Sequence, residues 1–187
     1  MKKMEEEMKI VAVLGSPREQ SASSTIVKQI LEGAETNGHT YTVYEASKIN
    51  INGCQACGVC RNNAVDCIQN DDLKSYWSDL HEADVLIVSS PNYHANVCGP
   101  MVSFLNRHYC LRTADKILRL KPGKRIIGVF SQGNTDVYGY ESTYKWFLSR
   151  FTAYNMELAD MIIHTEEMAV TENSDIMKRA YELGKKL

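Results

Sequence analysis

The sequence predicts an α/β protein in which helices cover both faces of a five-stranded parallel sheet, a three-layer sandwich. Short β-branched runs alternate with segments of helical periodicity along the chain. The 187 residues are 44% hydrophobic and 24% charged, which suits one globular domain over residues 1–187 with a sizeable core. No internal repeat interrupts the alternation, and a cysteine-rich insertion stands at about residues 50–70.

Five runs have the length and composition of strands. KIVAVLG opens the series at residues 9–15, and TYTVYE at residues 40–45 alternates polar and apolar positions, as an edge strand does. ADVLIVSS at residues 83–90 is almost wholly apolar, which is typical of a strand buried on both faces. The last two strands are expected at KRIIGVFSQG, residues 124–133, and MELADMIIH, residues 156–164.

The segments between these strands carry apolar residues at helical spacing. The expected helices are residues 24–36, a segment capped by Asp71 or Asp72, a segment opened by Gly99 and Pro100, residues 140–151, and residues 174–187. In the third of them we expect Met101, Phe104, Leu105 and Tyr109 to point inward. Each helix then has an apolar face to lay on the sheet.

Connecting these elements by right-handed crossovers gives a flavodoxin-like sheet of strand order 2-1-3-4-5. Because the order reverses beside the first strand, ligands are expected outside the carboxyl ends of the strands. The unusual loops of the chain lie there. They are GSPREQSASST after the first strand, the cysteine stretch after the second, SSPNYHANVCGP after the third and SQGNTDVYGY after the fourth.

The loop after the first strand is rich in hydroxyls and leads directly into a helix. Its backbone N–H groups and Ser and Thr side chains can hold a phosphate at the positive end of the helix dipole, and Arg18 can add a charged contact. It is neither a Walker loop nor a GxGxxG fingerprint, because Gly15 stands alone. The alternative is a Ser-rich helix cap without a ligand.

Three stretches together resemble a known family. GSPR with Ser24 and Thr25, SSPNYHANVCGPMVSFLNR, and FSQG at the end of a strand are similar to the NAD(P)H-dependent FMN reductases and flavodoxin-like reductases, from about residue 9 to about residue 165. Within that family, the cysteine stretch followed by paired Asp residues resembles the iron-sulfur flavoproteins, which hold FMN and a [4Fe-4S] cluster.

The resemblance implies a set of cofactor-binding residues. Those expected at the FMN phosphate are Ser16, Arg18, Ser23, Ser24 and Thr25. Those expected to border the isoalloxazine are Pro91, Asn92, Tyr93, His94 and Asn96, with Ser131, Gln132 and Gly133 on its other side.

The third loop also suits a flavin by its chemistry. A flavin needs a flat slot with polar groups for the ring N and O atoms and an aromatic wall, which PNYHAN can supply. A packing role for Tyr93 and a surface role for His94 are the alternatives. The other histidines, His39, His81, His108 and His164, show no partners by spacing and are predicted to lie on the solvated surface.

The stretch GCQACGVCRNNAVDCIQNDD contains Cys54, Cys57, Cys60 and Cys67. Two CxxC steps and a nearby fourth thiol suit a [4Fe-4S] cubane, and Gly53 and Gly58 permit the tight turns. Zinc on the same sulfurs and a dithiol redox pair are the alternatives. Four buried structural cysteines fit poorly, because the intervening residues are polar.

Charge and composition limit the partners. The net charge is −2 without basic runs, so we expect neither nucleic acid nor an anionic membrane as a partner. The charged N-terminal stretch is unlike a signal peptide, and no apolar run reaches the ~18 residues of a membrane span, so a cytoplasmic protein is expected.

The predicted function is that of an FMN-dependent oxidoreductase. Electrons would pass from NAD(P)H or a reduced ferredoxin to an acceptor, with the cluster as relay and no catalytic side chain, since the flavin carries the chemistry. A non-catalytic electron carrier and a redox or metal sensor are the alternatives. A homodimer or homotetramer is expected, in which the cluster of one subunit can serve the flavin of another.

Overall fold

The structure is a computed structural model that describes residues 7–187. The strands are β1 (Lys9–Leu14), β2 (Thr40–Glu45), β3 (Val85–Tyr93), β4 (Asn96–Val97), β5 (Lys124–Gln132) and β6 (Met156–Thr165). The helices are α1 (Ala22–Glu35), α2 (Val59–Asn62), α3 (Lys74–Glu82), α4 (Gly99–Arg107), α5 (Glu141–Thr152) and α6 (Asp175–Lys185), with a 3-10 turn η1 (His108–Leu111).

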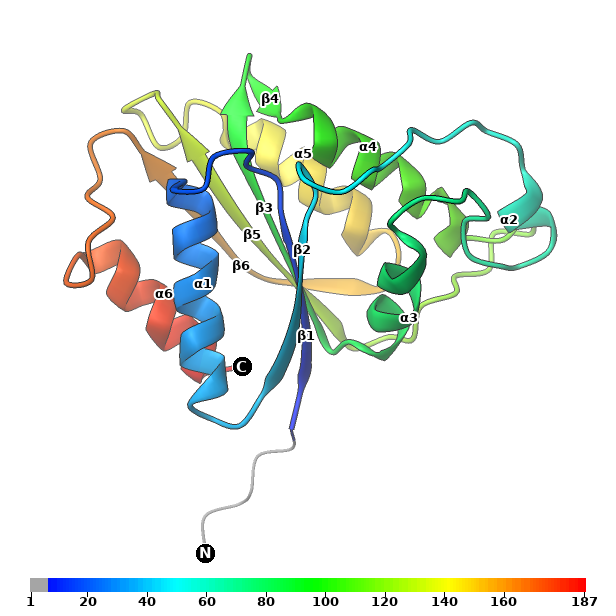
Figure 1. Cartoon of the computed structure of the whole chain (residues 1–187), viewed down its shortest axis with the longest axis horizontal. Coiled ribbons are helices and arrows are strands. Elements are labelled where there is room, and N and C mark those ends of the chain that lie inside the picture. Colours follow the sequence, from blue (N-terminus) through cyan, green and yellow to red (C-terminus); the bar gives the residue numbers. More distant parts are fainter. Residues whose placement is uncertain (1–6) are drawn as a thin grey trace, which may run out of the picture.

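The sheet has the order β2-β1-β3-β5-β6, and all neighbours on this path are parallel. This confirms the predicted flavodoxin-like order and places β2 at an edge. Figure 1 shows α1 and α6 on one face of the sheet and α3, α4 and α5 on the other. Between residues 7 and 187, no helix is long and apolar enough to cross a membrane.

Two hydrophobic cores follow from the pleat of the strands, because successive side chains point to opposite faces. Along β1, Ile10, Ala12 and Leu14 join the core under α1 and α6. Val11 and Val13 join the core under α3, α4 and α5. In β3, the apolar run at residues 85–88 is buried at every position, as the sequence predicted for this strand.

Tyr109 departs from the prediction. Its side chain is 44% exposed, whereas Phe104 is fully buried and Leu105 is partly buried. The α-helix ends at Arg107, and the chain continues as the 3-10 turn η1. Because a 3-10 turn has 3.0 residues per turn instead of 3.6, residues beyond Arg107 leave the apolar face that the periodicity projected.

The histidine prediction is wrong at three positions. His39, His108 and His164 are buried, and His81 is partly exposed. His39 accepts a hydrogen bond from the backbone N–H of Met8, and His164 Nε2 lies 2.9 Å from the carbonyl oxygen of Met168. Met8 lies 31 residues before His39 in the sequence, so the spacing of residues could not indicate this partner.

His108 is packed among aromatic rings and bonded at both nitrogens. Its Nε2 lies 2.7 Å from the hydroxyl of Tyr76, and its Nδ1 lies 2.9 Å from the carbonyl oxygen of Phe104. Burial lowers the pKa of His108 to about 4. The imidazole is therefore neutral in the folded protein throughout the physiological pH range.

This shift makes stability depend on pH. An unfolded histidine titrates near pH 6.5, so between pH 6.5 and 4 the unfolded chain binds more protons, and the contribution of His108 to stability declines as pH falls through that window. We expect the free energy of unfolding in urea to be about 2 kcal/mol lower at pH 5 than at pH 7 on account of this residue. The variant His108→Asn should show a smaller difference, and an unchanged difference would contradict this account.

Candidate functional site

The loops after β1, β3 and β5 meet at the carboxyl edge of the sheet, above its three central strands (Figure 1). Gly15, directly after β1, donates its N–H to the carbonyl oxygen of Ser89 at 2.9 Å. The thiol of Cys98, at the start of α4, donates to the carbonyl oxygen of Gly15 at 3.1 Å. The first and third loops are therefore joined at their bases.

The first loop gathers hydroxyls at the N-terminus of α1. Ser21 is the N-cap, because its Oγ accepts the N–H of Ser24 at 3.1 Å. Ser16, Ser23 and Ser24 are buried beside it. Since Ser21 performs the capping, the hydroxyls of Ser16 and Ser23 are not needed for it, and this set of neutral donors at a positive helix end suits a phosphate.

Two further members of the predicted phosphate group lie nearer to solvent. Arg18 has an exposed side chain, and its backbone N–H donates to Ser16 Oγ at 3.2 Å. Thr25 is partly buried in the first turn of α1. The guanidinium of Arg18 is thus free to approach an anion on this loop.

The third loop is a tight hairpin between β3 and β4. His94 and Ala95 have φ of 53° and 61°, in the left-handed region, and Asn92 Oδ1 accepts the N–H of Ala95 at 3.1 Å. Pro91 is buried, while Tyr93, His94 and Asn96 are exposed. Tyr93 is 44% exposed, so the packing role for this ring is not what the structure shows.

Gln132 connects the fourth loop to the third through Tyr144 of α5. Asn92 Nδ2 donates to the Tyr144 hydroxyl at 3.0 Å, and that hydroxyl donates to Gln132 Oε1 at 3.0 Å. Gln132 Nε2 in turn donates to the carbonyl oxygens of Asn134 and Asp136. Burial raises the pKa of Tyr144 to about 12, so its proton stays available for this chain.

The sequence indicates for Tyr144 only a place in the expected helix at residues 140–151, which has an apolar face. Its ring does pack there, stacked on Phe130 with centroids 4.3 Å apart. The hydroxyl at the end of the ring could not be assigned, because its partners lie 52 and 12 residues away along the chain. Ser131 is partly buried and Gly133 is exposed beside Gln132, so the three predicted residues of this loop remain together.

Replacement of Tyr144 by Phe tests this connection. The variant keeps the ring but leaves Gln132 Oε1 and Asn92 Nδ2 without their shared partner, which should cost about 1–2 kcal/mol of stability. We expect FMN affinity, measured by quenching of flavin fluorescence, to fall several-fold because both loops lose their alignment. Tyr140→Phe is the matched control, because Tyr140 is a partly buried tyrosine at the N-cap of α5, and this variant should bind FMN as the wild type does.

The cysteine loop is coiled by three left-handed residues. Ala56, Gly58 and Ala64 have φ of 53°, 74° and 55°. The backbone N–H of Ala56 donates to Cys54 Sγ at 3.4 Å. Such turns reverse the chain between successive thiols, as the two CxxC steps require.

The four thiols of the cysteine loop lie at different depths. Cys54 and Cys57 are exposed, Cys67 is partly buried and Cys60 is buried. The pKa of Cys60 is raised first by burial and then by the charges of the other three thiols, so their sulfurs are within electrostatic reach of it. Within the described part of the chain, no three His, Cys, Asp or Glu side chains are arranged as metal ligands. Four cysteine thiols are the ligands that an iron-sulfur or zinc centre uses, so the donor set fits such a centre in its chemistry. The four sulfurs do not surround a common point in the structure.

A buried arginine holds this loop from the protein side. Arg107, 1% exposed at the end of α4, donates through Nε to Cys67 Sγ at 3.2 Å and through a terminal nitrogen to the carbonyl oxygen of Asn52 at 2.9 Å. It also forms a buried ion pair with Asp71. Burial alone would raise the pKa of the Asp71 carboxyl, but the hydrogen bonds from Arg107 and from the N–H of Asn52 hold it below its usual value.

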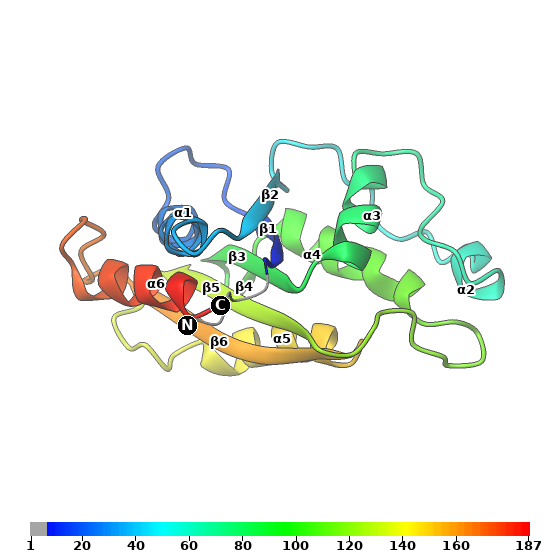
Figure 2. The same ribbon diagram turned by 90° about the horizontal axis from the view of Figure 1, so that it is seen from below.

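The cysteine loop starts beside the hydroxyl-rich loop after β1 and then leaves it. Ser47, just after β2, donates its hydroxyl to the carbonyl oxygen of Ser16 at 2.8 Å. The chain then runs to α2, which lies at the end of the molecule away from α1 in both views (Figure 1 and Figure 2). Within one chain the cysteines are thus displaced sideways from the other three loops.

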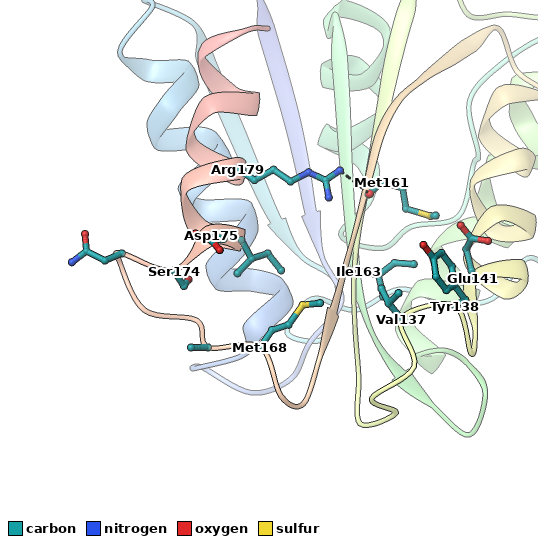
Figure 3. Close-up of a pocket in the computed structure, with 12 residues that line it drawn as sticks. Val137, Tyr138, Glu141, Met161, Ile163, Met168, Ser174, Asp175 and Arg179 are labelled. Atoms are coloured by element: carbon teal, nitrogen blue, oxygen red, sulfur yellow. Dashed lines mark hydrogen bonds between the residues drawn. The ribbon is translucent and has the colours of Figure 1, made fainter.

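A cavity of about 750 Å³ lies beside the fourth loop and β6. Figure 3 shows Val137 and Tyr138 on one side of β6 and Met168 with Arg179 of α6 on the other. Met161 and Ile163 of β6 also line it. Its lining contains none of the residues predicted to bind FMN or the cluster.

The sheet order, the hydroxyl-rich loop and the polar loops after β3 and β5 define a flavodoxin-like flavoprotein. The chain belongs to the NADPH-dependent FMN reductase family, whose model matches residues 8–144. This confirms the family resemblance drawn from the sequence.

Several curated relatives are iron-sulfur flavoproteins. One from Archaeoglobus fulgidus is 34% identical over 100 residues, which is 54% of this chain but only 45% of that protein. One from Methanosarcina thermophila is 29% identical, covering 73% of this chain and 69% of its own length. One from Methanocaldococcus jannaschii is 24% identical, covering 96% of this chain and 95% of its own.

Solved structures agree on the fold. An NAD(P)H:quinone oxidoreductase from Methanothermobacter marburgensis superposes with a TM-score of 0.77 at 17% identity, covering 97% of this chain and 96% of that one. An archaeal flavodoxin superposes with a TM-score of 0.59 at 14% identity, covering 96% of this chain and 95% of that one. At these identities the likeness concerns architecture alone.

Proposed function

We propose that the protein is an FMN-dependent oxidoreductase that passes electrons from NAD(P)H or a reduced ferredoxin to an acceptor through a [4Fe-4S] cluster. The observation that carries the proposal is the cysteine loop. It carries four thiols within fourteen residues, and it follows Ser47, whose hydroxyl donates to the carbonyl oxygen of Ser16 in the loop after β1. The names of the iron-sulfur flavoprotein relatives support the same assignment.

The residues of the chain would bind and orient the cofactors. The hydroxyls of Ser16, Ser23 and Ser24 and the N-terminus of α1 would hold the FMN phosphate, with Arg18 and Thr25 at its rim. Asn92 and Gln132 would meet the ring from two loops that Tyr144 keeps aligned. When bound, FMN supplies two-electron chemistry and a cluster supplies one-electron transfer.

The proposal includes a homo-oligomer, because the cysteine loop and the flavin site lie apart within one chain. Because α2 lies away from the loops after β1, β3 and β5, which would bind FMN, a homodimer or homotetramer would allow the cysteine loop of one subunit to reach the flavin of another (Figure 1). We place this assembly in the cytoplasm, where reduced thiols persist.

Anaerobic purification with iron and sulfide supplied tests the cluster. We expect flavin bands, a broad visible shoulder and about four iron and four sulfide per chain. Cys57→Ser should lose the iron and keep FMN, whereas Cys98→Ala, a cysteine outside the loop, should keep the iron. Zinc without iron would reject the cluster and favour a metal sensor.

Steady-state oxidation of NADH and NADPH by the loaded protein tests the reductase. We expect turnover well above that of free FMN at equal concentration. A rate no higher than free FMN, together with rapid reduction by a reduced ferredoxin, would favour a non-catalytic electron carrier.

A further inference from the structure

We propose that Arg107 is a positioning residue for the cysteine loop, which fixes the sulfur of Cys67 and raises the reduction potential of the cluster that this sulfur would bind. The inference rests on the proposed function, since it concerns the same cluster. It assigns a role to a side chain that is not itself a ligand.

Arg107 joins the two stems of the cysteine loop. Asn52 stands two residues before Cys54, and Asp71 stands four residues after Cys67. The guanidinium of Arg107 bonds to the carbonyl oxygen of Asn52 and to the carboxylate of Asp71, and that carboxylate accepts the N–H of Asn52 at 3.0 Å. A single planar side chain thus sets the spacing between the start and the end of the loop.

The same side chain is aimed at one ligand sulfur. Arg107 Nε donates to Cys67 Sγ at 3.2 Å, and the side chains of Arg107 and Asp71 are both fully buried. Asp71 engages the terminal nitrogens, which leaves the Nε–H directed at the sulfur. The orientation is therefore fixed by three partners and does not depend on contact with solvent.

The hydrogen bond from Arg107 to Cys67 should change the reduction potential of the cluster in one direction. Reduction of a cluster adds negative charge that is shared with its sulfur ligands, and hydrogen bonds to those sulfurs are among the factors that set the potential. A buried Nε–H donor stabilises the more negative state more than the less negative one, because water does not compete for the sulfur. Asp71 offsets the net charge of the guanidinium, so the hydrogen bond to the sulfur carries this effect. The presence of Arg107 should therefore make the cluster easier to reduce.

Two variants separate positioning from simple structural support. Arg107→Lys keeps the charge but loses the planar fork, and the double variant Arg107→Met with Asp71→Asn removes both charges, so that no buried ion is left unpaired. Arg119→Lys is the control, because Arg119 pairs with Asp66 of the same loop at 2.8 Å and donates to the carbonyl oxygen of Cys110. The measurements are iron content, melting temperature and an anaerobic redox titration followed by electron paramagnetic resonance.

In the double variant we expect the ratio of reduced to oxidised cluster at a fixed ambient potential to fall about tenfold, which for one electron equals a midpoint about 59 mV lower. Arg107→Lys should fall by less, and Arg119→Lys should match the wild type. Loss of iron from both Arg107 variants at a wild-type melting temperature would also support the positioning role.

The contrary outcomes are distinct. Wild-type protein that binds FMN but no iron and sulfide would reject the proposed function together with this inference. Wild-type protein that binds the cluster, with iron content and potential unchanged in both Arg107 variants, would overturn this inference alone. An equal shift in Arg119→Lys would overturn it as well, because the effect would not depend on contact with the sulfur.

Discussion

Asp71→Ala is expected to lower the free energy of unfolding of the cofactor-free protein by about 3–5 kcal/mol. Asp71 and Arg107 form an ion pair in which neither side chain is exposed. Removing one partner leaves the guanidinium buried without a counterion, and the desolvation cost of its charge is then no longer offset. The stems of the cysteine loop also lose the carboxylate that accepts the N–H groups of Asn52 and Leu73.

Urea unfolding and thermal melting measure this effect, and the melting temperature should fall by roughly 10 °C. The neighbouring substitution Asp72→Ala is the matched control. Asp72 also accepts a backbone N–H, that of Asn50 at 2.7 Å, but it is exposed, so its loss should cost about 1 kcal/mol or less. Equal effects of the two substitutions would show that the buried ion pair is not the cause.

The fold was predictable because its determinants are local. The apolar runs at β1, β3 and β5 and the periodic apolar residues of α1 and α5 state which surfaces must be buried, and crossover handedness then leaves few sheet orders. The end of α4 was not predictable in this way. No proline or glycine stands between Arg107 and Tyr109, so the change to a 3-10 turn left no local signal.

The sequence indicated which loops differ from ordinary connections, but it did not indicate the hydrogen-bond networks that join them. Cysteine spacing indicated which loop carries four thiols, and serine content indicated the hydroxyl-rich loop at the start of α1. Arg107 and Tyr144 were missed, because their roles come from single polar atoms that meet partners far along the chain. For Arg107 the partners are 36 to 55 residues away. One signal could have indicated the role of Arg107. Helical periodicity places this charged residue on the buried face of α4, where it needs a polar partner.

Gly15→Ala is expected to push the hydroxyl-rich loop after β1 away from the sheet. A Cβ at this position would overlap Met101 Cγ and would lie 2.6 Å from the carbonyl oxygen of Ser89. The methionine can move, but the carbonyl belongs to β3 and is held by its neighbours in the sheet. The loop that begins at Gly15 must therefore shift away from β3, which should cost about 1–3 kcal/mol of stability.

Such a shift carries the adjacent Ser16 away from the N-terminus of α1, and with it the hydroxyl that would contact a phosphate. We expect FMN affinity to fall at least about tenfold, a loss near 1.4 kcal/mol of binding free energy. Gly99→Ala is the matched control, because a Cβ there meets no atom within 4 Å. Titration of FMN fluorescence against each variant decides the matter: Gly15→Ala binding FMN as tightly as Gly99→Ala would contradict the assignment of this loop to the phosphate.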